Sequence, residues 1–192
     1  MKKIFLLILL LACLYFKSNA QFNKKWLVSG GGQVSVYNQK LVYKASNGSY
    51  TTNGNQTNIG FGIEAGRFIL KNLSVSYKYT YLLWDDNTGN KWRVNLNRNE
   101  ILINKLFPIK NDLFFNLGIS PFYQKATTKE NNLSAFETIS HGCVFYVGFN
   151  FQIDRASLVS VNYFRIIDNL PATIFSKPGI ELSYKYIFNE KK

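Results

Sequence analysis

The 192-residue sequence has few of the residues and patterns that mark several large classes of protein. It contains two cysteines, and only Cys143 follows residue 20, so the sequence predicts no intrachain disulfide and no cysteine-based metal or redox site. His141 is its one histidine. No long apolar run and no sustained helical periodicity follows Ala20, which argues against a membrane-spanning helix in that part.

Acidic residues are also scarce. Eleven Asp and Glu face 23 Lys and Arg, which gives a net charge of +12, or +9 when the three lysines of the first twenty residues are removed. Such an excess favours acidic partners, here the phosphates of lipid or lipopolysaccharide. Nucleic acid is not an expected partner, because the chain has no basic helix and no base-stacking motif. No motif predicts a cofactor.

The first twenty residues have the form of a secretion signal. Met1-Lys2-Lys3 is a basic start, and residues 4–12 are an unbroken apolar run. Ser18-Asn19-Ala20 has the small-x-small form of a cleavage site. We expect a signal peptide over residues 1–20 and one domain over residues 21–192, exported from the cytoplasm.

A second interpretation of this segment involves its cysteine. Leu10-Leu11-Ala12-Cys13 loosely resembles a bacterial lipobox, in which Cys13 becomes the lipidated first residue. Cleavage after Ala20 fits the sequence better, because the residue two before Cys13 suits that motif poorly. The sequence leaves both alternatives open.

The rest of the chain repeats an alternating pattern. From Leu73 to Leu83 every second residue is apolar or aromatic, and the pattern recurs at residues 113–119, 145–153 and 180–188. A period of two places the apolar side chains on one face of a β-strand. The sequence predicts eight strands, at residues 26–37, 57–70, 73–84, 91–106, 112–125, 138–153, 157–167 and 179–189.

The connections between these strands alternate in length. Those at residues 71–72, 108–111 and 154–156 are short, and the longer polar ones are residues 38–56, 85–90, 126–137 and 168–178. Long loops at one end and short turns at the other are typical of bacterial outer-membrane barrels. We expect residues 38–56 to form the main outer loop.

These features resemble a known group of proteins. The Ser18-Asn19-Ala20-Gln21 site, the eight strands and the final Tyr184-Lys185-Tyr186-Ile187-Phe188 are similar to small outer-membrane β-barrels of the OmpX and OmpA transmembrane-domain type, and to the barrel-domain proteins common in Bacteroidetes. The resemblance implies an all-β, eight-stranded, antiparallel up-and-down transmembrane barrel in the bacterial outer membrane. It also implies that the barrel-assembly machinery inserts the chain.

The alternation assigns side chains to two faces. The face expected to contact lipid is uncharged and comprises Val34, Val36, Ile59, Phe61, Ile63, Val75, Tyr77, Tyr79, Leu117, Ile119, Phe145, Val147, Phe149, Leu182 and Tyr184. The face expected to point into the lumen is polar and comprises Asn58, Gly60, Gly62, Glu64, Ser76, Lys78, Asn95, Asn97, Asn116, Ser120, Asn150, Ser183 and Lys185.

Charged residues on the inner face predict a buried polar network. Glu64 and Lys78 lie on neighbouring strands at similar heights above the turn at residues 71–72, and we expect Arg93 and Lys185 to join them. Charges inside a barrel must be paired, because an isolated buried charge is costly. Structural filling is the favoured role over an ion or proton path, since eight strands leave room for side chains but no pore.

The fourth strand breaks this alternation. Trp92, Val94 and Leu96 share one parity, whereas Ile101 and Ile103 have the other. One extra residue would restore a single apolar face. We therefore predict a β-bulge near Arg98-Asn99.

His141 raises the question of catalysis. His141-Gly142-Cys143 resembles the His-x-Ser pair of the lipid A 3-O-deacylases, but the serine is replaced and the next strand offers no carboxylate at the corresponding place. A histidine at the rim is the favoured interpretation. The sequence therefore predicts no catalytic residue, while a lipid A-modifying barrel enzyme remains an alternative.

Two further motifs are weak. Gly30-Gly31-Gly32 lacks the Lys-Ser/Thr and the helix of a phosphate-binding loop, and glycines in a strand more often permit close packing. Residues 85–90 have oxygen ligands at short spacing but lack the full calcium-loop pattern. The sequence predicts no metal site.

The favoured function is non-enzymatic. We expect a closed-lumen barrel with a structural, adhesive or envelope-interaction role, in which outer loops contact other envelope proteins. An exported soluble lipid-binding barrel is a further alternative, which an apolar lumen and a polar outside would indicate. Six lysines in or beside the outer loops are expected to contact lipopolysaccharide phosphates: Lys40, Lys44, Lys91, Lys125, Lys129 and Lys177.

Overall fold

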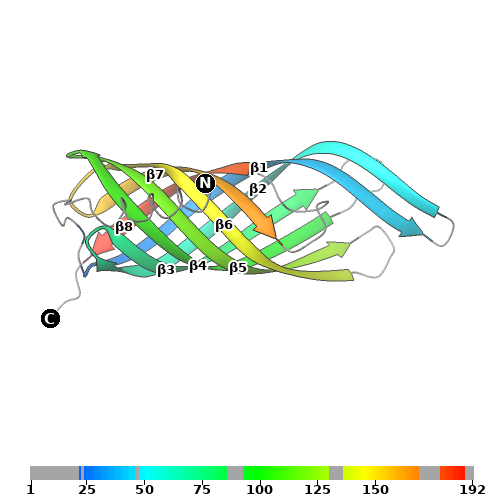
Figure 1. Ribbon diagram of the computed structural model, residues 1–192, viewed down its shortest axis with the longest axis horizontal. Helices are drawn as coiled ribbons and strands as arrows, with labels where there is room; N and C mark the ends of the chain where they lie inside the picture. Colours follow the sequence, from blue (N-terminus) through cyan, green and yellow to red (C-terminus); the bar gives the residue numbers. More distant parts are fainter. Residues whose placement is uncertain are drawn as a thin grey trace, which may run out of the picture.

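Eight antiparallel strands form a closed barrel in the computed structural model (Figure 1). The structure describes residue 22 and residues 24–45, 48–85, 93–129, 136–168 and 178–188. Each strand pairs with the next, and the last pairs with the first. The strands are β1 (Trp26–Ala45), β2 (Gly48–Leu70), β3 (Leu73–Asp85), β4 (Arg93–Lys110), β5 (Leu113–Lys129), β6 (Phe136–Gln152), β7 (Ser157–Asp168) and β8 (Pro178–Phe188). The predicted fold class is confirmed.

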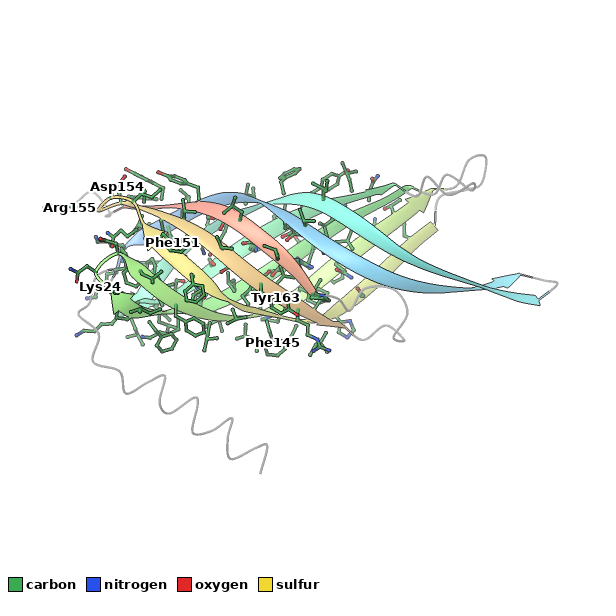
Figure 2. The ribbon with its side chains drawn as sticks, turned by 90° about the horizontal axis from the view of Figure 1, so that it is seen from above. Lys24, Phe145, Phe151, Asp154, Arg155 and Tyr163 are labelled. Carbon is green, nitrogen blue, oxygen red and sulfur yellow. The ribbon has the colours of Figure 1, made fainter. Side chains whose placement is uncertain are left out.

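The alternating pattern of the sequence sets which side chains point outward. In β8 every second residue is buried along the whole strand: Ile180 and Leu182 are 59% and 57% exposed, whereas Glu181 and Ser183 are each 5% exposed. Figure 2 shows the aromatic side chains of Phe145, on β6, and Tyr163, on β7, projecting from the outer wall. The wall is therefore apolar outside and largely polar inside, the reverse of a soluble lipid-binding barrel.

The first hairpin is longer than the sequence predicted. The expected loop at residues 38–56 is wrong, because β1 continues to Ala45 and β2 begins at Gly48, with Lys40 opposite Asn53 and Leu41 opposite Thr52. The β-branched and aromatic residues scattered through this polar stretch favour extended pairing over a loop. In Figure 1 this hairpin projects well beyond the other strands.

The fourth strand shows a second difference. The predicted bulge near Arg98-Asn99 is wrong, because β4 pairs with β3 without interruption from Lys105 to Arg93. Leu96 therefore points into the lumen and is 4% exposed, while Asn95 and Asn97, predicted to face inward, lie on the outer wall. The register shifts in β4 and β2 instead occur beside short turns, at Pro108/Lys110 and Phe68/Leu70.

The two ends of the barrel differ in their connections. Residues 71–72, 111–112 and 153–156 join strands at one end of the barrel, here called the turn end. The opposite end is here called the loop end. Asn72 takes a left-handed conformation with φ of 54°, which asparagine tolerates well. At the β6–β7 turn, where Figure 2 labels Asp154 and Arg155, the backbone N–H of Ala156 donates to Asp154 Oδ1. The distance is 2.7 Å. That hydrogen bond, with one from Ser157, lowers the pKa of Asp154.

Within the described ranges, the structure contains no helix that is long and apolar enough to cross a membrane.

Candidate functional site: the filled lumen

The turn end of the lumen is closed by apolar side chains. Seven buried residues, here called the apolar plug, pack together at this end: Phe22, Leu27, Phe68, Leu106, Phe114, Leu158 and Ile187. Phe22 comes from the segment before β1, and its ring centroid lies 5.4 Å from that of Phe68 and 5.5 Å from that of Phe114. Six strands and the segment before β1 thus contribute to one closure.

Asparagines form a polar row above part of the plug. The side-chain amide of Asn150 donates to Asn116 Oδ1 at 2.8 Å, and the hydroxyl of Ser160 donates to Asn150. The Asn116 amide lies 3.5 Å from Asn104 Oδ1. Each of these buried amides has a hydrogen-bond partner. The polar row can therefore lie between the apolar plug and the charged side chains with little loss of stability.

Six charged side chains fill the middle of the lumen. None of these residues is more than 6% exposed as a whole, and three cations balance three carboxylates. We call them the charged layer: Glu64, Lys78, Arg98, Glu100, Glu181 and Lys185. Buried charges of one sign would repel and remain unsolvated, so the equal numbers are a condition for this filling.

Glu64 anchors one side of the charged layer. Its Oε2 accepts a hydrogen bond from Lys185 Nζ at 3.2 Å, and its Oε1 accepts one from the hydroxyl of Ser76 at 2.6 Å. Lys78 is its direct cross-strand neighbour on β3. Both oxygens of this carboxylate are therefore used.

Lys78 connects opposite walls of the barrel. Its ammonium pairs with Glu181, which lies on β8 rather than on a strand adjacent to β3. It also donates to the hydroxyl of Tyr146 at 3.3 Å and lies 4.5 Å from the centroid of that ring. One ammonium thus joins β3, β6 and β8.

The network continues to β4. The hydroxyl of Tyr146 donates to Glu100 Oε2 at 2.6 Å, and Arg98 Nε donates to Glu100 Oε1 at 2.7 Å. The Arg98 guanidinium lies 5.9 Å from the centroids of Phe122 and Phe164. Both rings belong to a second apolar cluster, formed by Leu102, Phe122, Val144, Tyr146, Phe164 and Ile166.

A small cavity adjoins the charged layer. It measures about 10 Å³ and is lined by Ser29, Gly31, Gln33, Gly62, Glu64, Lys78, Glu181 and Ser183. Two polar atoms of its lining, Gln33 Nε2 and Ser183 Oγ, are buried and have no hydrogen-bond partner among the described residues. The space suits about one water molecule and no larger solute.

The predicted network overlaps this layer in part. Glu64, Lys78 and Lys185 lie in it. The backbone of Arg93 lies at the loop end of β4, opposite Asp85, and its side chain is outside the described residues. The sequence prediction missed Glu181, Arg98 and Glu100. The outward positions of Ile180 and Leu182 were the signal that Glu181 points inward.

The predicted lysine contacts lie mostly outside the described side chains. Lys125, on the outer wall of β5, is 43% exposed and pairs with Glu137 at 2.7 Å. Lys40 and Lys44 belong to β1 and Lys129 to β5, but their side chains are not described. Lys91 and Lys177 fall outside the described residues altogether.

The remaining candidate residues occupy the outer wall or the backbone ladder. His141 is exposed on β6 opposite Tyr123, and Cys143 lies between Pro121 and Ile167. A Cβ at Gly31 would overlap the backbone of Ser183, so close strand packing accounts for that glycine. Within the described ranges no three His, Cys, Asp or Glu side chains gather as metal ligands. Most of residues 85–90 lies outside those ranges.

This geometry defines a closed eight-stranded barrel with an apolar outer wall and a lumen filled by side chains. No family model and no curated protein matches the sequence. Solved structures share the fold: the N-terminal β-barrel domain of Pseudomonas aeruginosa OprF has a TM-score of 0.60 at 10% identity, covering 86% of this chain and 98% of that one. Outer membrane protein OprG of the same organism has a TM-score of 0.59 at 11% identity, covering 90% and 100%.

A third similar structure is Ail, the attachment invasion locus protein of Yersinia pestis, in complex with the heparin analogue sucrose octasulfate. Its TM-score is 0.55 at 12% identity, and the match covers 86% of this chain and 99% of that chain. At such identities these comparisons show the fold alone.

Proposed function

We propose that this protein is an integral outer-membrane barrel that is not an enzyme and does not conduct solutes. The main support for this proposal is the distribution of side chains. The outer wall is apolar, and side chains fill the lumen from the plug to the charged layer. An apolar outer wall satisfies the lipid, and the closed ladder leaves no unpaired strand edge in it. The similar outer-membrane barrels support this location.

The filled lumen supports a role without transport. The plug closes the turn end with packed rings, and the charged layer joins β2, β3, β4, β6 and β8 across the middle. The cavity of about 10 Å³ beside that layer is too small for a solute. An eight-stranded barrel has an interior just wide enough for side chains to fill it or for one small ligand, and here buried side chains fill it.

If the lumen conducts nothing, the surface at the loop end is the part of the barrel that makes functional contacts. The β1–β2 hairpin extends beyond the other strands and offers a contact surface for an envelope protein or another cell (Figure 1). Ail, whose name describes attachment and invasion, has a similar fold, which supports adhesion as the role. Lipopolysaccharide contacts by the outer lysines, insertion by the barrel-assembly machinery, and export by residues 1–20 belong to this proposal.

Cell fractionation with heat-modifiable gel mobility tests the proposal. The protein should be in the outer-membrane fraction, and the folded form should migrate differently from the boiled form. Recovery in the soluble periplasmic fraction, with the same mobility before and after boiling, would contradict it. Mass spectra of lipid A from cells with and without the protein test the enzymatic alternative, and unchanged acylation is the expected result.

A further inference from the structure

Three asparagines interrupt the apolar outer wall. Asn95, Asn97 and Asn99 occupy successive outward positions of β4, and we call them the asparagine row. Toward the turn end the next outward side chains of β4 are Ile101 and Ile103, which are 55% and 42% exposed. The wall thus changes from apolar to polar within one strand, where hydrocarbon would give way to lipid headgroups.

Strand length supports that placement. A tilted strand needs about 9–11 residues to cross a bilayer. On β4 the outward Lys105 donates to the carbonyl oxygen of Lys71 in the β2–β3 turn and so marks the turn-end rim, and β4 runs nine residues from Lys105 to Asn97. With the short turns on the periplasmic side, the asparagine row lies at the outer edge of the apolar band. Amides placed within hydrocarbon would lack partners, whereas headgroups offer them.

Two tyrosines fix the orientation of the row. The hydroxyl of Tyr79 donates to Asn97 Oδ1 at 2.5 Å, and the hydroxyl of Tyr77 donates to Asn99 Oδ1. Both amide oxygens are therefore occupied, and the side-chain nitrogens of Asn97 and Asn99 have no acceptor within the described protein. The result is a pair of oriented N–H donors on the outer surface.

Neighbouring strands extend this polar surface. Asn99 lies opposite Tyr123, which is 48% exposed, and Tyr123 lies opposite His141. Asn97 lies opposite Lys125, whose charge is balanced by Glu137. Donors and exposed aromatic rings therefore gather on a patch whose described charges cancel.

We propose that the asparagine row and its tyrosines bind the saccharide headgroup of an outer-leaflet glycolipid. Amide donors suit sugar hydroxyls, and aromatic faces suit the apolar faces of sugar rings. A site for bare phosphate would present unbalanced cations, whereas Lys125 is paired with Glu137. This inference rests on the proposed outer-membrane location and adds a partner on the wall, separate from the projecting hairpin.

The test compares lipid binding by the full-length barrel and an Asn97→Leu/Asn99→Leu variant. Each protein is folded into phosphatidylcholine vesicles containing either lipopolysaccharide or phosphatidylglycerol, and the co-purifying lipid is counted by mass spectrometry. Losing the amide donors should reduce bound lipopolysaccharide about tenfold, the scale of one to two net hydrogen bonds. Bound phosphatidylglycerol, which is anionic but carries no saccharide, should not change.

A matched pair of tyrosine variants controls for general damage. Tyr79→Phe frees Asn97 and should weaken lipopolysaccharide binding, whereas Tyr184→Phe removes an outward hydroxyl on β8, which donates to Ser157, and should leave binding unchanged. A heat-modifiable shift confirms folding of each variant. If a variant shows this shift but its lipid binding does not change as expected, the result contradicts the glycolipid inference and not the proposal of an outer-membrane barrel.

Three results would overturn the inference. Wild-type lipopolysaccharide binding by the double leucine variant would show that the row is not the site. An equal loss of both lipids would indicate recognition of charge rather than of saccharide. A change of oligomeric state with unchanged lipid binding would assign the row to an interface between two copies of the chain.

Discussion

The apolar plug and the charged layer close the same lumen by different physics. The plug excludes water with packed rings, and its stability depends on volume and contact. The charged layer is held by ion pairs and hydrogen bonds that reach across the barrel, and its stability depends on balance. The plug should therefore tolerate substitution of one apolar residue by another of similar volume. The charged layer should tolerate only substitutions that remove a cation and its carboxylate partner together.

The largest expected effect comes from emptying the plug. Phe114→Ala removes a ring that is fully buried against Phe22, and loss of such a ring costs about 4 kcal/mol of unfolding free energy. Phe114→Leu should cost about 1.5 kcal/mol or less, because it keeps most of the apolar volume. Urea unfolding in phospholipid vesicles, followed by tryptophan fluorescence, measures both values.

Phe115→Ala is the control for the plug. Phe115 points outward beside Phe107 and Phe149, so its truncation exchanges ring contacts for lipid contacts. Its loss should be clearly smaller than that of Phe114→Ala. Equal losses at the two positions would show that the interior ring has no special role.

The next effect tests the balance of the charged layer. Lys78→Met leaves the Glu181 carboxylate buried without its cation and should cost about 3 kcal/mol. Adding Glu181→Gln removes the orphaned charge and should restore most of the loss. Lys125→Met, which breaks an exposed pair, should have little effect in the same unfolding assay. Additive losses from Lys78→Met and Glu181→Gln would contradict this account of the layer.

The smallest expected effect comes from the β6–β7 turn, which lies outside the apolar plug and the charged layer. The pKa of Asp154 is lowered in the folded protein, so its ionised form stabilises the β6–β7 turn. This contribution is fully present at pH values above the unfolded pKa of about 3.9. It is lost as the pH falls through the lowered pKa of the folded protein. Asp154→Asn should slightly reduce stability at pH 7. The difference from wild type should vanish in strong acid, as a pH series of unfolding midpoints will show. A constant difference across the series would argue against ionisation as its source.

The fold was predictable because β8 and most other strands combine a clean period of two with short turns. The phase of the fourth strand was not predictable, because apolar residues lie on both of its faces. Leu96 and Leu102 point into the lumen while Ile101 and Ile103 point out. Because the lumen is itself partly apolar, hydrophobicity alone suggested a break in the alternation of β4, whereas the strand pairs with β3 without interruption.

The charged layer was predictable only between neighbours. Glu64 and Lys78 follow from counting back from one turn, and their positions in the register agree with that count. The partnership of Lys78 with Glu181 crosses the lumen from β3 to β8, so it depends on the stagger of the closed barrel. Phe22 lay before the first predicted strand, and no pattern in the sequence indicated that it joins the plug.

Single-channel recording in planar bilayers tests the closed lumen most directly. The folded wild-type protein, inserted with its heat-modifiable shift confirmed, should give no steady conductance steps, since the plug and the charged layer occupy the lumen. Steady channels of a uniform, resolved size would contradict the account. They would show that water and ions pass where the rings and ion pairs are placed.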